Sequence, residues 1–214
     1  MIRLDHVSVS IAGAPVLNDV SMEIASGRMV GLIGRNGAGK TTLMRSIMGL
    51  LPLRAGRITL DDVDLGQVAP HRRSRLGIGF MPEDRRLIPD LSVGENVMVP
   101  AWATNQADAA DRLSWAYARV PEVQQFADRK ASLLSGGQQK LVALVRSLMT
   151  GRQLLLLDEP FEGVAPALAQ RLMEVIASLK GEGASVLISE SDYTYSKALV
   201  DQVFVIERGV VTLQ

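Results

Sequence analysis

The chain has 214 residues, of which 47% are hydrophobic and only 4% aromatic. This length and apolar content suffice for one full-sized core, so we expect residues 1–214 to form a single domain. The 23 basic and 23 acidic side chains cancel, which argues against a nucleic acid as the main partner because nucleic-acid binders usually carry excess positive charge. The chain has no cysteine, which excludes disulfides and thiolate metal sites.

The sequence contains neither a secretion signal nor a membrane-spanning stretch. The N-terminal segment Met1–Asp5 lacks the charged start and long apolar core of a secretion signal. No apolar stretch approaches the roughly 20 residues that span a bilayer, because even the run Leu154–Leu157 stops at Asp158. We therefore expect a cytoplasmic protein that is not itself inserted in a membrane and that meets one only through a partner.

Short β-type runs separated by turn signals fill the first 32 residues. We expect a small sheet from residues 4–10 and 20–24 that leads into a central strand over 29–33. A glycine-rich loop follows this strand directly. Apolar residues then recur at helical spacing, which predicts a helix over residues 41–50 that Pro52 stops.

The middle of the chain contains two strand-like runs and then a helical segment. The runs cover 57–60 and 76–81, and the polar stretch between them carries three arginines that we expect on a solvated face, namely Arg72, Arg73 and Arg75. Residues 87–134 change character and predict a helical subdomain inserted into the domain. We expect Trp102 and Trp115 to fill the core of this subdomain, with a groove for a membrane partner as the alternative for either ring.

Helices and strands alternate over the last third. The expected elements are a helix after Ser135, a strand over 154–157, a helix over the apolar positions 168–179, and strands over 186–189, 203–206 and 210–213, the last two joined by a turn at Arg208 and Gly209. A parallel sheet wrapped by helices is the simplest packing for this order. The fold class is therefore α/β.

The loop Gly34–Thr41 reads Gly-Arg-Asn-Gly-Ala-Gly-Lys-Thr and fits the phosphate-loop pattern at a strand-to-helix junction. A flexible glycine turn is the structural alternative. The glycines let consecutive N–H groups point into one concavity, and the helix adds the positive end of its dipole. Lys40 would neutralise the β and γ oxygens of ATP, and Thr41 would ligate Mg²⁺. The expected nucleotide-binding residues are Gly34, Asn36, Gly37, Ala38, Gly39, Lys40, Thr41 and Thr42.

The pentapeptide Leu134-Ser135-Gly136-Gly137-Gln138 places a good N-cap and two glycines at a helix start. Such a helix start exposes N–H groups and forms a second anion-binding site that lacks a lysine. A capped helix with a glycine turn and no ligand is the structural alternative. With the phosphate loop, the pentapeptide resembles the ATP-binding cassette (ABC) family, whose signature it matches in full. The resemblance covers residues 2–213.

This resemblance implies a P-loop, RecA-like core with an N-terminal antiparallel β subdomain and the helical subdomain 87–134. It also implies that two cassettes pack head to tail, so that ATP on one phosphate loop is covered by the signature of the other. Ser135, Gly136, Gly137 and Gln138 would then contact nucleotide bound to a partner cassette.

The apolar run Leu154–Leu157 ends in two carboxylates, Asp158 and Glu159, before a proline. Alone, these carboxylates could simply end a strand or cap the next helix. Beside the other two motifs they fit a Walker B element, in which Asp158 reaches Mg²⁺ through water and Glu159 is the base or polariser for the attacking water. Glu159 and Lys40 are the expected catalytic residues.

Four positions depart from the common pattern of the family. Ile11 stands where an aromatic ring usually stacks on adenine, and a loss of base stacking costs about 1–3 kcal/mol. Glu83 stands where a Gln usually contacts Mg²⁺ and the membrane partner, and a carboxylate can still be a metal ligand. Ser191 replaces a His that contacts the γ-phosphate, and Ala165 replaces a common Asp. Modest ATP affinity and slow hydrolysis follow.

The departures together resemble one of the two ATPase subunits of branched-chain amino-acid importers, which pair as unlike cassettes. The resemblance implies a subunit that hydrolyses ATP to drive uptake of such amino acids or related small solutes through a membrane-spanning permease, at the cytoplasmic face of the inner membrane. A second copy of this chain is the alternative to an unlike cassette. Rival functions are a soluble cassette protein of DNA repair, chromosome handling or translation, and a nucleotide-sensing subunit with vestigial hydrolysis.

Overall fold

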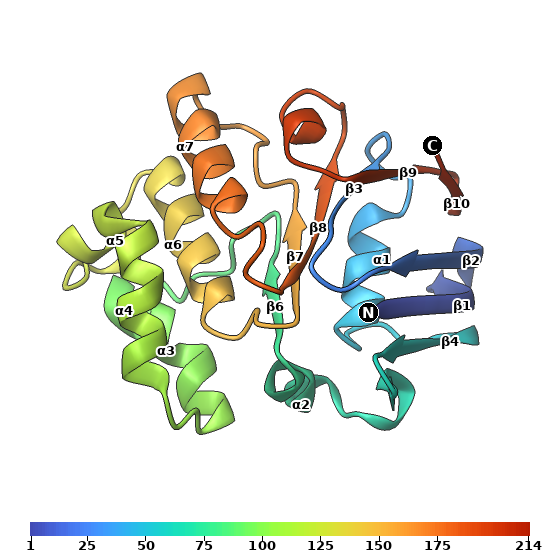
Figure 1. Ribbon diagram of the computed structural model, residues 1–214, viewed down its shortest axis with the longest axis horizontal. Coiled ribbons are helices and arrows are strands. Elements are labelled where there is room, and N and C mark those ends of the chain that lie inside the picture. Colours follow the sequence, from blue (N-terminus) through green and yellow to red (C-terminus); the bar gives the residue numbers. More distant parts are fainter.

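A six-stranded sheet runs through the middle of the protein in a computed structural model that describes all 214 residues (Figure 1). In spatial order its strands are β10 (Val210–Leu213), β9 (Gln202–Glu207), β3 (Met29–Ile33), β8 (Ser185–Glu190), β7 (Leu154–Asp158) and β6 (Ile78–Met81). The strands from β9 to β6 are parallel, and β10 is antiparallel to β9. All residues of β7 and β8 are buried, as expected for parallel strands covered on both faces. The predicted α/β class is confirmed.

A separate antiparallel sheet is built mainly from the N-terminal residues. Its order is β2 (Ala14–Ile24), β1 (Ile2–Ile11), β4 (Ala55–Leu60) and β5 (Val63–Asp64). The β1–β2 hairpin turns at Ala12 and Gly13, whose φ angles are 49° and 84°. Two positive φ angles in succession match the twist of the flanking strands. This sheet is the antiparallel part that the sequence predicts.

Alternate residues of β7 face two different hydrophobic cores. Leu154 and Leu156 pack with helix α1 (Lys40–Ile47) and the antiparallel sheet, whereas Leu155 and Leu157 pack with α6 (Gly136–Leu148) and α7 (Pro166–Ala177). Figure 1 shows α1 on one side of the parallel sheet and α6 and α7 on the other. The end of β7, which carries the two candidate carboxylates, is therefore fixed by packing on both faces.

Helix α1 ends earlier than the sequence predicts. It stops at Ile47 rather than at residue 50, and Gly49 follows with a φ angle of 73°. A left-handed glycine just after a helix is a common stop. Pro52 is therefore not what ends the helix.

The expectation that Arg73 lies on a solvated face is wrong. Arg73, in the short helix α2 (Pro70–Arg73), donates to the carbonyls of Ser46 and Ile47 at 3.1 and 2.6 Å and to two further carbonyls. Its side chain can be buried because these acceptors satisfy the guanidinium group at the C-terminus of α1. Arg72 and Arg75 are exposed, as expected.

Three helices lie beside α6 at one end of the molecule (Figure 1). They are α3 (Val93–Thr104), α4 (Ala109–Arg119) and α5 (Pro121–Gln125). Trp102 does not fill their core, because it is 53% exposed. The inner face of α3 is already occupied by Val93, Val97 and Ala101 at four-residue spacing, so Trp102 lies on a different face. Trp115 is partly buried against the core.

The C-terminal hairpin turns at Arg208 and Gly209, as predicted, with φ angles of 48° and 79°. The N–H of Gly209 donates to the carbonyl of Ala38 at 3.0 Å, so the hairpin supports the glycine-rich loop. Short 3-10 turns lie at Leu65–Gln67, Ser74–Leu76, Ala131–Leu133 and Ser196–Ala198. None of the helices combines the length and the apolar content that a membrane crossing requires.

Candidate nucleotide site

The glycine-rich loop joins the C-terminal end of β3 to the start of α1, the edge at which α/β sheets bind ligands. Gly37 and Gly39 have φ angles of 82° and 116°, which residues with side chains rarely adopt. A Cβ at Gly34 would lie 2.3 Å from the carbonyl oxygen of Ile206. Because no side chain caps α1, its first N–H groups are left for a ligand.

A cavity of about 420 Å³ opens over this loop. It is lined by Val16, Asn36, Gly37, Gly39, Lys40, Thr41, Thr42, Glu83 and Glu159. The structure thus brings together most of the residues predicted for the phosphate side. Gly34 and Ala38 shape the loop without lining this cavity, and Asp158 lines a neighbouring one with Thr41 and Glu83.

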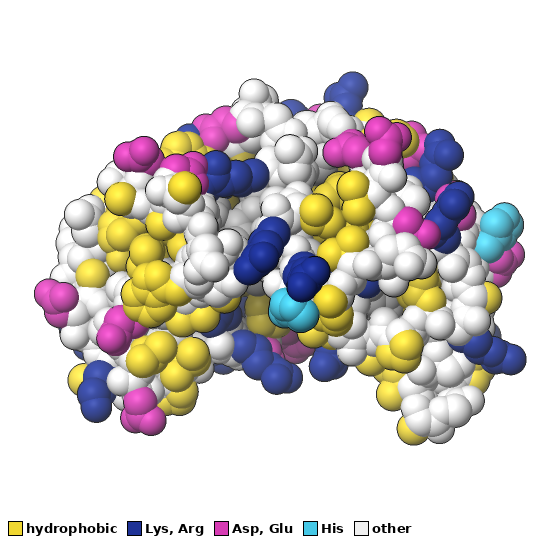
Figure 2. All heavy atoms as spheres, turned by 90° about the horizontal axis from the view of Figure 1, so that it is seen from below, with side chains coloured by type: hydrophobic (Ala, Val, Ile, Leu, Met, Phe, Trp, Pro, Cys, Tyr) yellow, Lys and Arg dark blue, Asp and Glu magenta, His cyan; other side chains and the backbone are white.

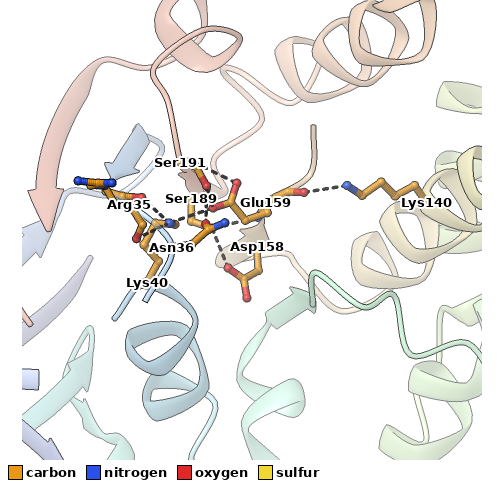
Figure 3. A network of polar contacts seen from close by, with 9 residues as sticks. Arg35, Asn36, Lys40, Lys140, Asp158, Glu159, Ser189 and Ser191 are labelled. Carbon is orange, nitrogen blue, oxygen red and sulfur yellow. Dashed lines mark hydrogen bonds and ion pairs between the residues drawn. The ribbon is translucent and has the colours of Figure 1, made fainter. Parts of the chain in front are cut away.

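The ammonium group of Lys40 is engaged by the protein itself (Figure 3). Its Nζ lies 3.0 Å from Oε1 of Glu159, and it donates to the carbonyls of Arg35, at 3.2 Å, and Gly34. The two charged side chains are only 5% and 7% exposed, so water screens this ion pair weakly. Nucleotide phosphates would have to take the place of these acceptors.

Glu159 begins the turn after β7 with a φ angle of 47°, which is sparsely populated for residues other than glycine. Its Oε1 accepts a hydrogen bond from Ser191 Oγ at 2.8 Å, and its Oε2 accepts one from the Ser191 N–H at 3.2 Å. Ser191 Oγ also lies 2.8 Å from Oδ1 of Asn36. Ser191, at the place of the family's His, therefore orients the candidate base.

Asp158 is fully buried at the end of β7. Its Oδ1 accepts from Ser189 Oγ at 2.7 Å, and the same Oγ accepts from the Glu159 N–H at 3.0 Å. One hydroxyl thus orients both acidic residues. Burial raises the pKa of Asp158, and the hydrogen bond from Ser189 acts against that rise.

The residues around Asp158 fit a magnesium ion. Its Oδ2 is buried without a hydrogen-bond partner, near Thr41, and Mg²⁺ prefers oxygen ligands. Burial, followed by the charges of Glu162, Asp158 and Glu159, raises the pKa of Glu83, so a cation is electrostatically favoured here. No group of three or more acidic or histidine side chains is placed to hold a metal ion on its own.

The signature residues form the first turn of α6, outside this site. Ser135 Oγ accepts from the Gln138 N–H at 3.3 Å, and Gln138 Oε1 accepts from the Ser135 N–H at 3.0 Å. Ser135 and Gly136 are exposed. None of residues 135–138 lines the cavity at the glycine-rich loop or its neighbour. One chain therefore carries two separate anion-binding helix starts.

Two residues of the site were not expected from the sequence. Val16 lines the cavity, whereas Ile11 does not and is 42% exposed. Ser189 bridges the acidic pair. The sequence position of Ser189 could have indicated this role, because a serine near the C-terminal end of a buried parallel strand lies at the edge of the sheet where ligands bind.

Known proteins share this architecture. The sequence profile of the ABC transporter family matches residues 17–162. The chain is 33% identical over its whole length to the high-affinity branched-chain amino acid transport ATP-binding protein BraG of Pseudomonas aeruginosa, of which it covers 91%. It is 34% identical to the lipopolysaccharide export system ATP-binding protein LptB of Escherichia coli, over 95% of this chain and 86% of LptB. A solved ATP-binding subunit of an ABC transporter superimposes with a TM-score of 0.88 and 26% identity, over 100% of this chain and 89% of that one. The chain therefore belongs to the ABC transporter family and is an ATP-binding, ATP-hydrolysing subunit of that family.

Proposed function

We propose that this chain powers a membrane importer of branched-chain amino acids or related small solutes by closing on a second, unlike cassette when ATP binds. The observation that carries the proposal is the separation of the two half-sites. The glycine-rich loop lies at a cavity, and the signature turn of α6 is exposed outside it. The exposed start of α6 can bind a phosphate group. Because it lies outside this chain's own nucleotide cavity, the ATP that it contacts would be the one bound to another cassette. The permease would hold the pair at the cytoplasmic face of the inner membrane.

In the proposed site, ATP phosphates bind the loop and the ammonium group of Lys40 in place of Glu159. When bound, Mg²⁺ neutralises charge on the β and γ oxygens. Thr41 and Asp158 would hold this ion, with Glu83 facing it. Glu159 then polarises the attacking water, and Ser191 keeps its carboxylate oriented.

An unlike pair is favoured by Ser191. Its hydroxyl is engaged with Glu159, and a serine lacks the cationic donor that a histidine offers to a γ-phosphate. The site on Lys40 would hydrolyse ATP slowly, while Ser135 and Gly137 complete a better equipped site on the partner. The purified chain should be a weak ATPase, and Ser191→His should raise its turnover. Unchanged turnover would count against this arrangement.

A groove offers a docking place for a permease. This cavity of about 560 Å³ is the one that Asp158 lines, and its walls come from α1 and the residues after it, the loop after β6, α3 and the end of α6. Glu83 lines both this groove and the cavity at the glycine-rich loop, so a segment seated here would touch a residue that faces the nucleotide. Figure 2 shows the face that carries α2 and α3, where hydrophobic side chains gather over the helical half and Lys and Arg side chains near the middle. Such a surface fits an amphipathic segment.

The class of solute rests on resemblance. The Pro82–Arg86 loop, the Gly163–Pro166 segment and the absent His resemble the branched-chain amino-acid subfamily, and the full-length similarity to BraG supports it. The similarity to LptB is equally high. Export of a lipopolysaccharide-like lipid is therefore the second candidate.

The test is to isolate the complex from membranes through a tag on this chain, identify the other subunits and reconstitute them in proteoliposomes. Uptake of leucine, isoleucine or valine that requires ATP supports the proposal, whereas hydrolysis stimulated only by lipopolysaccharide supports the second candidate. Recovery without any membrane protein would favour a soluble cassette. ATP-dependent dimerisation without turnover, even with the partner cassette, would indicate a sensor.

A further inference from the structure

Lys140, in the second turn of α6, is a buried cation that none of the three sequence motifs includes. Its side chain is 5% exposed, and burial lowers its pKa. Its Nζ donates to the carbonyl of Glu159 at 2.9 Å and to the carbonyl of Glu162. Burying an ammonium group is costly unless good acceptors surround it. The acceptors here are main-chain oxygens of one short turn.

The two carbonyls bracket the turn from which the candidate base projects. Glu159 opens this turn in a left-handed conformation, and the N–H of Glu162 donates to the Glu159 carbonyl at 3.2 Å. Ser189 holds the N–H of Glu159 on the other side. Figure 3 shows the Lys140 side chain reaching from its helix towards Glu159, opposite Lys40 and Ser191. Lys140 therefore fixes the backbone of Glu159, while Ser191 fixes its carboxylate.

The same helix begins with the signature. Lys140 lies one turn beyond Gly136, and α6 continues without interruption to Leu148. Arg85 donates to the Gly136 carbonyl at 3.2 Å, and Arg146 donates to the carbonyl of Arg86 at 2.7 Å, so the loop that carries Glu83 is fastened to both ends of α6. The backbone hydrogen bonds of an α-helix join each residue to the fourth one before it, which links Lys140 directly to Gly136. A displacement of its first turn therefore displaces Lys140.

We propose that Lys140 is a positioning residue that couples the signature turn of this chain to its own Glu159, so that nucleotide held by a partner cassette against Ser135–Gln138 tightens the turn that aims the base. The coupling rests on the proposed pairing of two cassettes. The positioning of Glu159 does not, because its contacts lie within one chain.

The positioning is tested on the full chain with Lys140→Met, which keeps the apolar stem and removes the donors. Lys140→Arg restores donors, and Lys197→Met, at an exposed position, is the matched control. We expect Lys140→Met to lower kcat about tenfold to a hundredfold, the cost of misplacing a catalytic group, with KM and the Kd of ATP in EDTA changed less than about twofold. Hydrogen exchange of residues 159–163 should accelerate, while that of β3 should not.

Lys140→Arg should recover part of kcat and of the exchange protection, and Lys197→Met should behave like the unmodified chain. Wild-type kcat together with unchanged exchange at 159–163 in Lys140→Met would overturn the positioning role. If Lys140→Met does not fold, Lys140→Arg and Lys140→Gln are compared by the same exchange measurement. Equal protection of residues 159–163 in both would overturn the role as well, since a glutamine is too short to span both carbonyls.

The coupling is tested in a Glu159→Gln background, where ATP should accumulate a dimer. Residues 159–163 should gain protection on dimerisation, and Lys140→Met should abolish this gain although the dimer still forms. A gain that persists without Lys140 would overturn the coupling. Absence of any dimer, including with the co-purified second cassette, would contradict the proposed pairing instead, and the measurements of kcat and exchange on the single chain would still decide the positioning role.

Discussion

The starts of α1 and α6 are both built to bind anions, but their polar groups are satisfied by the protein in different ways. The first turn of α1 has no side-chain cap, is wrapped by left-handed glycines, and places the buried ammonium group of Lys40 beside Glu159. The first turn of α6 is exposed and closes on itself, because Ser135 and Gln138 cap each other. A charged, uncapped start needs a ligand, whereas a neutral, self-capped one can remain in water until a ligand arrives.

The difference also indicates what each site must give up to bind ATP. At α1, the phosphates of ATP have to displace Glu159 from its buried ion pair with Lys40. Binding of ATP and release of the Glu159 carboxylate are therefore linked. At α6, only a neutral capping contact has to rearrange. The first site is therefore expected to control hydrolysis and the second to control association of cassettes.

The largest expected effect comes from removing the charge of the base. Glu159→Gln should lower ATP turnover by about a hundredfold or more, the usual contribution of a general base. The same change frees Lys40 from its ion pair, so ATP should bind at least as tightly and an ATP-bound dimer should accumulate. Turnover assays and size-exclusion chromatography with ATP measure both effects. Glu174→Gln, at an exposed position on α7, is the control, and weaker ATP binding by Glu159→Gln would contradict the linkage.

A smaller effect is expected at the signature, where a matched cap exists elsewhere in the chain. Ser135→Ala and Ser92→Ala each remove an N-cap serine from a capping box, and each should cost about 1 kcal/mol of unfolding free energy. Only Ser135→Ala should also weaken ATP-dependent dimerisation, by about tenfold if one contact to phosphate is lost. ATP affinity of the monomer should stay unchanged in both. Equal dimerisation by the two variants would mean that the signature serine serves only as a cap.

Contiguous motifs are the features of this site that a sequence predicts best. The glycine-rich loop and the signature are contiguous, so their residues could be assigned roles by position along the chain. Ser189, Val16 and Lys140 reach the site from distant segments, and no local pattern distinguishes a serine in a strand or a lysine on a helix. The burial of Arg73 cannot be predicted from the sequence for the same reason. Its partners are backbone carbonyls of α1, which composition cannot reveal.

Ile11 and Val16 allow a test of where the adenine ring of ATP binds. Ile11→Tyr should tighten ATP binding by about fivefold, at the lower end of the stacking free energy of about 1–3 kcal/mol, because Ile11 is exposed beyond the cavity rather than lining it. Isothermal titration in EDTA measures the change without hydrolysis. Ile88→Tyr, at another exposed isoleucine, is the control. If Val16→Ala weakens ATP binding and Ile11→Tyr has no effect on it, the adenine ring lies against Val16 instead.

The smallest expected effect concerns stability and the charge of Asp158. Because burial raises its pKa, the folded state binds this proton more tightly than the unfolded state, and ionisation destabilises the fold. The destabilisation is complete above the folded-state pKa and disappears as the pH falls below the ordinary value of 3.8. Without nucleotide or Mg²⁺, Asp158→Asn should therefore raise the melting temperature at pH 7 by roughly 2–4 °C.

The advantage of Asp158→Asn should shrink as the pH is lowered to about 4, and it should reverse at pH 7 when Mg²⁺ and ATP are added, because the amide lacks the oxygen that fits the cation. Differential scanning calorimetry of both proteins across this range measures the difference, with Asp90→Asn at an exposed site as the control. A variant that is less stable than the unmodified chain at every pH would show that Asp158 is held by protein contacts alone. The carboxylate of Asp158 would then resemble the first turn of α6, because its polar atoms would be satisfied by the protein without a ligand.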